Sequence, residues 1–531
     1  MPLSPALFRP RLTYPSIPYG RMLDRPVALY PERAAVVGGE VSLTFRELEG
    51  LVNAFAGAPR GLGIGRGDRV SLFMANRPEY VIAFYALARL GAVSSPVNPS
   101  YRERELAYQL ADAEAVAVVT QADLLPLVRA VRAEIPGLKH VIAVDGAEVG
   151  TPDVLRLADL LRAAPALPVP EPPIALDDVL VLPYSSGTTG LPKGVLLSHR
   201  AFACNNIQFL SASRLSDADR VLIFLPLYHI YGLMLMGGSV HAGACLVLME
   251  RFDAAECCRL VERHRITILP VVPPVLAALL DAPQARRTDW SSVRHVMVGA
   301  APVPPELARR FRQATGVRVV QGYGLTEAGP ITHLNPVDDD DRLTLDTAGL
   351  PCSDTEHRVV DLETGARVLP PGEVGEVCVR GPQLMLGYWK APEATAAALR
   401  EGWLYTGDVG RIDERGYLTI TDRKKEMIKF KGFGIAPAEI EALLFEHPGV
   451  ADAAVIGRPD PEAGEVPKAF VVRRDPALTA EALLNWTAPR LAGFKRLHEV
   501  EFVDAIPKTA SGKILRRVLR EQERRRLGLG T

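Results

Sequence analysis

Residues 179–194 read VLVLPYSSGTTGLPKG, an apolar run followed by glycines, hydroxyl side chains and one lysine. The run predicts a buried strand, and the segment after it predicts a loop. Glycine lets the backbone turn sharply and bring its N–H groups close to an anion, while hydroxyl and ammonium groups add donors. The residues of this kind are Ser185, Ser186, Gly187, Thr188, Thr189, Gly190, Lys193 and Gly194. The stretch therefore predicts a phosphate-binding loop at the end of a strand.

The loop fits neither of two common phosphate-binding patterns. A Walker loop needs GxxxxGK[ST], whereas here Lys193 follows a proline and precedes a glycine. The dinucleotide pattern GxGxxG is also absent from the loop. The alternative interpretation is a polar surface loop, because glycine and threonine are common in loops. The density of donors favours a phosphate loop of another type.

The segments around the loop alternate between strand and helix patterns through the first two thirds of the chain. One helical pattern, TFRELEGLVNAF, begins with Thr44 and Glu47 at the spacing of a capping box. Alternation of this kind is typical of parallel sheets covered by helices. The strand-like runs lie at 115–120, 140–144, 221–226, 244–249 and 294–299.

The pattern changes after about residue 345, where short strands and Thr-Gly and Pro-Pro-Gly turns favour antiparallel hairpins or a small barrel. A basic stretch, TDRKKEMIKFKGFGIAP (421–437), comes next and is followed by a compact piece with its own helical pattern. The sequence thus predicts an N-terminal domain over 1–421, with a barrel-like part at about 345–421, and a C-terminal domain over 422–531.

Composition narrows the class of protein. The chain has 531 residues, too many for one core, and its 48% apolar and 23% charged content is ordinary for a soluble globular protein. The net charge of −1 gives no reason to expect nucleic acid as a partner. The six cysteines show no CxxC spacing, which favours free thiols in a reducing compartment. The longest apolar run, 266–280, is too short to span a bilayer, so a cytoplasmic protein is expected.

Two further stretches suit a nucleotide's metal ion and ribose. QGYGLTEAGP (321–330) offers Thr326 and Glu327, and a carboxylate beside a phosphate loop suits Mg²⁺, although a turn glutamate can also be merely exposed. YTGDVG (405–410) places Asp408 after a turn, where it can accept ribose hydroxyls or cap the turn.

A lysine and a histidine complete the set. Lys513, in PKTASGKILRR (507–517), stands where a terminal helix begins, although the helix dipole there favours anions. Such a lysine is either exposed or reaches for an external anion. His229 lies between tyrosines in PLYHIYG (226–232), and a lone histidine is more often a core residue than a working one. Together the stretches supply phosphate, metal, ribose and lysine groups, the parts of an ATP site.

Five motifs in order, YSSGTTGLPKG, QGYGLTE, YTGD, DRKKEMIKFKGFGIAPAEIE and PKTASGK, resemble those of the adenylate-forming acyl-CoA synthetases. That superfamily includes firefly luciferase and the adenylation domains of nonribosomal peptide synthetases. Within it, the chain most resembles fatty acyl-CoA ligases and 4-coumarate-CoA ligases. The resemblance implies an α/β fold: a large N-terminal domain of two doubly wound sheets plus a small β-barrel, then a small mobile α+β C-terminal domain.

The resemblance also implies a two-step reaction. A carboxylate attacks the α-phosphate of ATP to give acyl-adenylate and pyrophosphate, and the thiol of CoA then displaces AMP. Because carboxylate and triphosphate repel each other, Mg²⁺ and lysines must neutralise the charge on the transferring group.

The family's roles transfer to matching residues. The loop residues Ser185 to Gly190 and Lys193 would orient the β- and γ-phosphates, and Thr188 and Glu327 would hold Mg²⁺. Thr326 would contact the α-phosphate, Lys513 would bridge it to the acyl carboxylate, and His229 would gate the thiol channel. The adenine and ribose contacts would be Gly299, Ala300, Ala301, Gln321, Gly322, Tyr323, Asp408 and Arg423. The acyl pocket would be lined by Tyr228, Met297, Gly299, Gly324, Pro330 and Ile331.

The C-terminal domain would rotate between the two half-reactions about a hinge at 422–425, with Lys425 at the pivot. After rotation, Lys429 would serve thioester formation, and Lys431, Gly432, Phe433 and Gly434 would build the CoA tunnel. Several relatives have glutamine or asparagine where this chain has Gly434.

The substrate stays open at this point. The expected pocket wall is apolar and offers no carboxylate to pair with an ammonium group, which disfavours amino acids. A medium- or long-chain fatty acid is the first expectation, and an aryl or cinnamate-type acid is the alternative. CoA is the expected acceptor, with an acyl or peptidyl carrier protein as another and a homodimer left open. A non-enzymatic nucleotide-binding regulator is the competing class, which the retained Lys513, Glu327 and Asp408 disfavour.

Overall fold

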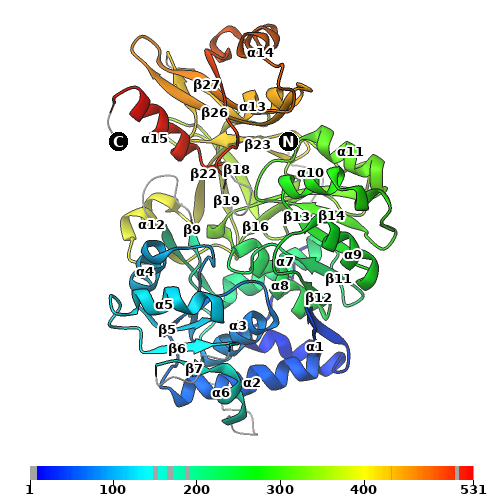
Figure 1. Ribbon diagram of the computed structural model, residues 1–531, viewed down its shortest axis with the longest axis vertical. Helices are drawn as coiled ribbons and strands as arrows, with labels where there is room; N and C mark the ends of the chain where they lie inside the picture. The colour runs from blue at the N-terminus through cyan, green and yellow to red at the C-terminus, as the bar shows by residue number, and fades with distance from the viewer. Residues whose placement is uncertain are drawn as a thin grey trace.

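The structure, a computed structural model, describes residues 9–146, 153–163, 172–185, 192–431, 433–508 and 514–529. Figure 1 shows a small C-terminal domain, in orange and red, above a much larger N-terminal part that runs from blue to yellow. Hydrogen-bonded strands form two nine-stranded and two five-stranded sheets. The predicted architecture, a large α/β part followed by a smaller domain, is confirmed. Within the described ranges, no helix combines the length and apolar character needed to cross a membrane.

The first nine-stranded sheet has the order β17-β16-β15-β14-β13-β11-β12-β1-β2 and is parallel from β15 to β1. Its strands are β1 (Ala34–Gly38), β2 (Val41–Thr44), β11 (Arg220–Ile223), β12 (Cys245–Leu248), β13 (Ile268–Val271), β14 (His295–Val298), β15 (Arg318–Gly324), β16 (Ile331–Leu334) and β17 (Leu350–Pro351). Helices between them are α7 (His199–Ser213), α8 (Ile230–Ala242), α9 (Ala254–His264), α10 (Pro273–Asp281) and α11 (Pro305–Thr315).

The second nine-stranded sheet has the order β20-β10-β8-β4-β3-β5-β6-β7, with β9 paired to β10. Its strands are β3 (Arg69–Phe73), β4 (Val93–Pro96), β5 (Ala115–Thr120), β6 (His140–Ala143), β7 (Leu155–Arg156), β8 (Val179–Val181), β9 (Tyr184–Ser185), β10 (Lys193–Ser198) and β20 (Gly387–Tyr388). The helices of this part are α1 (Asp24–Leu29), α2 (Phe45–Gly61), α3 (Pro78–Leu90), α4 (Glu103–Asp112), α5 (Leu125–Arg132) and α6 (Leu157–Ala163).

The antiparallel region predicted after residue 345 is a five-stranded sheet. It comprises β18 (Glu356–Val360), β19 (Gly375–Arg380), β21 (Leu399–Arg400), β22 (Trp403–Ile412) and β23 (Leu418–Arg423), with α12 (Pro392–Ala398) beside it. Over these described residues the pairings follow an open path, β18-β19-β22-β21 with β23 on β22, and not the closed ring of a barrel. Because β23 runs to Arg423, the last strand of the sheet leads directly into the predicted hinge.

The C-terminal domain holds the other five-stranded sheet, which has helices packed on it. Its strands are β24 (Ile428–Phe430), β25 (Phe433–Ile435), β26 (Val450–Asp460), β27 (Gly464–Arg473) and β28 (Glu499–Phe502), and its helices are α13 (Pro437–Phe445), α14 (Ala480–Thr487) and α15 (Arg516–Arg526). In Figure 1 the long β26–β27 hairpin lies at the top, and α15 lies at the side that faces α12.

Local sequence signals explain several element ends. The predicted capping box before α2 is confirmed, because Thr44 N–H donates to Glu47 at 2.8 Å and Glu47 N–H donates back to Thr44 Oγ1 at 3.2 Å. Helix α3 ends at Gly91, whose φ of 69° suits a residue without a side chain. Ser198 caps α7 by accepting from Ala201 N–H.

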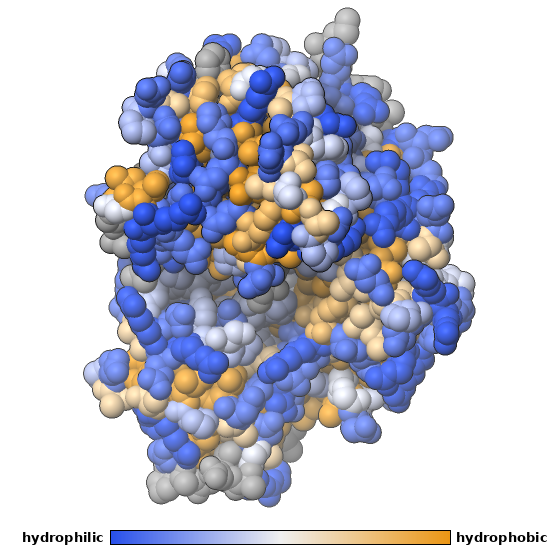
Figure 2. Space-filling view, turned by 45° about the horizontal axis from the view of Figure 1, so that its top comes forward, coloured by the Kyte–Doolittle hydropathy of each residue, from blue (hydrophilic) through white to orange (hydrophobic). Residues whose placement is uncertain are grey.

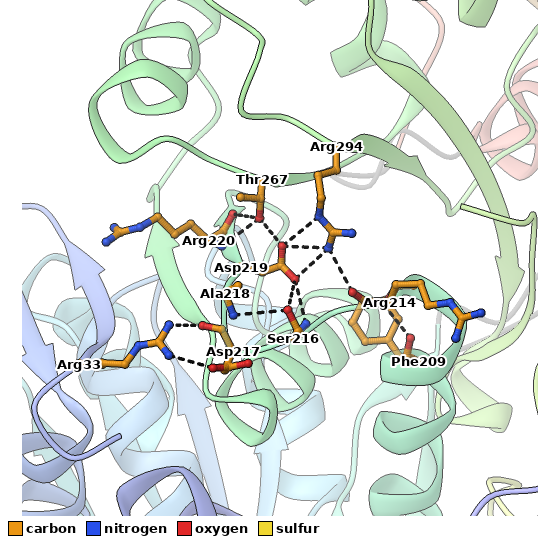
Figure 3. A network of polar contacts seen from close by, with 11 residues as sticks. Arg33, Phe209, Arg214, Ser216, Asp217, Ala218, Asp219, Arg220, Thr267 and Arg294 are labelled. Atoms are coloured by element: carbon orange, nitrogen blue, oxygen red, sulfur yellow. Dashed lines mark hydrogen bonds and ion pairs between the residues drawn. The ribbon is translucent and has the colours of Figure 1, made fainter. Parts of the chain in front are cut away.

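A buried carboxylate ties together three neighbouring strands of the first sheet at their amino ends (Figure 3). Asp219, 3% exposed, directly precedes β11, while Thr267 and Arg294 directly precede β13 and β14. Asp219 accepts from the Thr267 hydroxyl at 2.7 Å and from Arg294 at 2.8 and 2.9 Å. A hydrogen-bonded charge pair fixes strand ends firmly when it is well satisfied. The opposite, carboxyl edge of these strands is where α/β proteins usually place a site.

Candidate active site

The large cavity of about 660 Å³ lies at the carboxyl ends of the parallel strands, between both nine-stranded sheets and the strand that leads into the hinge. Figure 2 shows the surface hollowed between the C-terminal domain and the N-terminal part below it. Its polar end, where the phosphate and ribose contacts are predicted, is lined by Tyr184, Ser185, Lys193, Thr326, Glu327, Glu376, Tyr388, Tyr405, Thr406, Gly407, Arg423, Lys424 and Lys425. Its apolar end is lined by Tyr228, His229, Ile230, Tyr231, Met234, Met297, Val298, Gly299, Ala300, Gly324, Pro330, Ile331 and Leu334.

Asp408 and its neighbours form a buried charged group beside the cavity. Asp408, on β22, is 3% exposed; it accepts from the Tyr323 hydroxyl at 2.6 Å and pairs with Arg423 at 2.9 Å. Burial, together with the Asp408 charge, holds the pKa of Tyr323 well above its usual value, so the hydroxyl stays a donor. The β22–β23 pairing places Asp408 opposite Arg423, which explains how two distant motifs meet.

Glu327 lies in a short 3₁₀ helix, η5 (Thr326–Ala328), at the wall of the cavity. The Tyr388 hydroxyl donates to Glu327 Oε1 at 2.8 Å. Lys193, which begins β10, places its Nζ 5.5 Å from the centre of the same tyrosine ring. The predicted metal carboxylate thus accepts from the hydroxyl of Tyr388, and the predicted phosphate lysine lies over the ring of the same tyrosine.

The quoted loop is described only in part. Its entry, β9, pairs with its exit, β10, with Ser185 opposite Lys193, so the two ends of the loop meet at the cavity. Ser186, Gly187, Thr188, Thr189 and Gly190 lie outside the described residues. Their roles toward the phosphates, and that of Thr188 toward a metal ion, stay predictions.

The apolar end brings together all the residues predicted for the acyl pocket. Two glycines let backbone and ring approach closely. A Cβ on Gly299 would lie 3.0 Å from a carbon of the Tyr231 ring, and one on Gly324 would lie 2.3 Å from the Pro330 carbonyl oxygen. Burial raises the pKa of Tyr231, so this tyrosine is a neutral ring at the apolar end.

His229 lines the cavity and also begins helix α8. Its Nδ1 accepts from Tyr231 N–H at 3.3 Å, which caps the helix. The cap makes Nδ1 the acceptor nitrogen, which leaves the other ring nitrogen to carry the proton in the neutral form.

The adenine residues divide into two sets. Gly299, Ala300, Gly322 and Tyr323 line the cavity, whereas Gln321 and Ala301 are absent from its described lining. The Gln321 side chain accepts from Val303 N–H at 2.7 Å and donates to the Thr347 carbonyl at 3.1 Å. The Gln321 side chain therefore connects the backbone of the loop after β14 to Thr347. Its contact with adenine stays a prediction.

The predicted hinge reaches the cavity, whereas the described residues of the predicted tunnel lie outside its lining. Lys425 lines the cavity, and Lys424 pairs with Glu376 of β19 at 2.8 Å. Lys429, Phe433 and Gly434 belong to the β24–β25 hairpin, which, with Lys431, is absent from the described lining of the cavity. Gly432 and Lys513 lie outside the described residues.

The residues of the cavity could supply one oxygen ligand to a magnesium ion. Among the described residues no group of three histidine, cysteine or acidic side chains could enclose a metal ion. Mg²⁺ bound with nucleotide needs only one or two protein oxygens, the rest coming from phosphates and water. Glu327 lines the cavity and keeps Oε2 after its bond to Tyr388, so it can supply such an oxygen.

Sequence reasoning missed Tyr388, Glu376 and Tyr231, and it named Lys424 only as part of the hinge at 422–425. No spacing in the sequence marks Tyr388, since its position follows from the pairing of β20 with β10. Tyr231, by contrast, stands two residues after His229 in PLYHIYG, and the interest in the histidine could have extended to it.

Comparisons with known proteins show the family of the chain. A family model described as "AMP-binding enzyme" matches residues 23–389, and one described as "AMP-binding enzyme C-terminal domain" matches residues 439–513. The 4-coumarate–CoA ligase 5 of Oryza sativa subsp. japonica is 39% identical and covers 97% of each chain. The 4-coumarate–CoA ligase 1 of Petroselinum crispum is 39% identical over 92% of this chain and 91% of the relative.

Solved structures show the same likeness. The anthranilate CoA ligase AuaEII, solved in complex with anthranoyl-AMP, superimposes with a TM-score of 0.90 at 28% identity, covering 98% of this chain and 99% of the other. A Mycobacterium tuberculosis fatty acyl CoA synthetase gives a TM-score of 0.75 at 34% identity over 95% and 98% of the two chains. The chain thus belongs to the family of AMP-binding, adenylate-forming enzymes and is an AMP-forming acid–CoA ligase.

Proposed function

We propose that this ligase activates a hydrophobic aromatic acid of the cinnamate type and transfers the acyl group to CoA. The observation that carries the proposal is the apolar end of the cavity. There, Tyr231 faces Gly299, and methionine, isoleucine and leucine side chains complete the wall. An aromatic ring can pack on the Tyr231 ring at such an apolar wall, and the lining stabilises it by burial.

The charges around the apolar end support an acid without an amino group. No aspartate, glutamate, lysine or arginine lies among the described residues that line it. An ammonium group buried there would lack a counter-charge, at a large cost in free energy. The similarity to 4-coumarate–CoA ligases favours a cinnamate-type acid over the medium- or long-chain fatty acid expected first from the sequence.

The ATP end supplies the binding groups that adenylation needs. In this proposal Asp408 and Arg423 hold the ribose, and Lys193 and the loop before it bind the β- and γ-phosphates as a leaving group. Glu327 and Thr188 would hold Mg²⁺, which neutralises phosphate charge when it is bound with ATP. Lys513 would approach the acyl carboxylate and the α-phosphate, and so reduce the repulsion between them.

One screen tests the proposal. Purified enzyme is offered 4-coumarate, cinnamate, benzoates, medium- and long-chain fatty acids and phenylalanine, and AMP release is measured with CoA or a holo carrier protein as acceptor. We expect kcat/KM for a cinnamate-type acid with CoA to exceed that for any fatty acid by roughly tenfold or more. A preference for fatty acids would restore the first expectation, a preference for the carrier protein would change the acceptor, and no AMP release with any acid would favour a non-enzymatic role.

A further inference from the structure

Strand β20, only two residues long, connects the two halves of the ATP end. On one side it pairs with β10, with Tyr388 opposite Val195 and Gly387 opposite Leu196. On the other side, Met385 N–H donates to the Glu327 carbonyl at 2.9 Å. The short segment 385–388 therefore holds the exit of the phosphate loop and the helix that carries Glu327 in one hydrogen-bonded unit.

The Tyr388 side chain continues this connection inside the cavity. Its hydroxyl donates to Glu327 Oε1 at 2.8 Å, and its ring centre lies 5.5 Å from Lys193 Nζ. Among the residues that the structure describes, no other side chain donates a hydrogen bond to the Glu327 carboxylate. One carboxylate oxygen is therefore fixed, and the other is available to a cation.

The protonation state of Tyr388 agrees with a donor role. Burial, followed by the charge and hydrogen bond of Glu327, raises the pKa of Tyr388 above its ordinary value. A neutral phenol orients the carboxylate and presents an electron-rich face to an ammonium group.

We propose that Tyr388 is a positioning residue for ATP. Its hydroxyl sets the orientation in which Glu327 binds the divalent cation of the nucleotide, and its ring holds the Lys193 ammonium group at the cavity wall. The inference rests on the proposed ATP end of the site but not on the identity of the acid. The two parts of the side chain act on different ligands, the hydroxyl on the cation and the ring on the lysine.

Two substitutions separate these parts. Tyr388→Phe removes the hydroxyl and keeps the ring, and Tyr388→Leu removes both. The matched control is Tyr14→Phe, because the Tyr14 hydroxyl also donates to a carboxylate, Asp354, at 2.7 Å, while neither residue lines the cavity. Melting temperatures of all three variants show whether each protein is folded.

The readout is binding of a non-hydrolysable ATP analogue without any acid, measured by calorimetry with and without Mg²⁺, together with Mn²⁺ binding by electron paramagnetic resonance. In the wild type, Mg²⁺ should increase the affinity for the analogue. We expect this increase to be about tenfold smaller in Tyr388→Phe, because a hydrogen bond to a charged group is lost. Analogue affinity without the cation should stay as in the wild type. Tyr388→Leu should in addition bind the analogue about threefold more weakly without the cation.

Three results would overturn the proposal. They are an unchanged cation effect in folded Tyr388→Phe, an equal loss in Tyr14→Phe, or a wild-type protein whose analogue affinity does not respond to Mg²⁺. An incorrect acid class would leave all of these measurements unchanged and would appear only in the acid screen, so the two failures are distinguishable.

Discussion

Asp408 shows at the scale of a single residue how a buried charge can serve a ligand. A carboxylate offers about four lone-pair positions, and Tyr323 and Arg423 use one each in the structure. In the proposed function the others would accept ribose hydroxyls. In Asp408→Asn an NH₂ group replaces one acceptor oxygen, and Arg423 loses its counter-charge. We therefore expect KM for ATP to rise by roughly 10- to 100-fold in an ATP–pyrophosphate exchange assay, with a smaller change in the KM of the acid. An unchanged KM for ATP would place the ribose elsewhere.

Gly299 leads to a second prediction at the scale of a single residue, which concerns the size of the acid. A Cβ at this position would lie 3.0 Å from the Tyr231 ring, closer than such contacts usually are. We expect Gly299→Ala to lower kcat/KM for ring-bearing acids by about tenfold while a short acid such as propionate is less affected. Steady-state AMP release measures both. Gly50→Ala in α2 is the control, because a Cβ there meets nothing within 4 Å; equal effects on all acids would contradict a steric role.

The sequence motifs predicted which residues line the cavity, but they did not predict the side chains that these residues contact. Thr326, Glu327 and Lys193 all line the cavity, as expected from stretches rich in glycine, hydroxyls and charge. Tyr388 carries no such signal, because its contact with Glu327 depends on how β20 pairs with β10. Gln321 lies inside a predicted motif, yet its side chain braces backbone groups behind the cavity wall.

At the scale of elements, strands with continuous apolar runs were predicted closely. The run at 115–120 is β5, and the run at 266–280 contains β13 and α10. The β26–β27 hairpin was harder to predict, in part because β27 contains a buried lysine. Lys468 is 0% exposed and bonded to Glu499, Glu501 and Glu523 from β28 and α15, partners that no local pattern indicates.

The β24–β25 hairpin leads to a prediction about the two half-reactions. Lys429 is exposed on it, outside the described lining of the cavity, and would reach the site only after the domain rotates. We expect Lys429→Ala to adenylate nearly normally and to lose thioester formation. Lys513→Ala should do the reverse, since one lysine serves each charge-forming step. Pyrophosphate exchange measures the first step, and single-turnover conversion of supplied acyl-adenylate measures the second. Equal losses of both steps in both variants would contradict this division.

At the scale of the whole molecule, buried histidines make stability depend on pH. His333 Nε2 and His357 Nδ1 lie 2.9 Å apart, and burial lowers the pKa of His357 from 6.5 to about 4. Below pH 6.5, His357 therefore binds a proton in the unfolded chain, whereas in the folded chain it binds one only at about pH 4. The free energy of unfolding should fall in this window as pH falls, by up to about 1.4 kcal/mol per pH unit for one such histidine.

The variant His357→Gln tests this prediction by removing one of the titrating groups. Urea unfolding of wild type and variant is measured between pH 7 and pH 4. The slope of the free energy of unfolding against pH should be smaller in the variant, by an amount that corresponds to close to one proton. The same slope in both proteins would show that His357 does not contribute to the acid sensitivity.

The bonds around the hinge locate the change between the two domains. Arg423 and Lys424 pair with Asp408 and Glu376 of the N-terminal part. Glu426 instead pairs with Arg516 of α15, which also holds Glu441 of α13. The two neighbours of Lys425 in the chain, Lys424 and Glu426, thus bind side chains of opposite domains, and we expect the predicted rotation to occur at Lys425.

The Arg516 cluster has a consequence for the last residues of the chain. Burial raises the pKa of Glu441 to about 7 despite its pairing with this arginine, so the cluster needs Arg516 to stay charged and satisfied. A chain shortened after Leu515 would retain each residue named at the nucleotide and acid ends, yet Glu426 and Glu441 would lose their shared counter-charge. Proteolytic clipping, or a bulky tag that unwinds α15, would therefore leave these two carboxylates without a partner and destabilise the C-terminal domain.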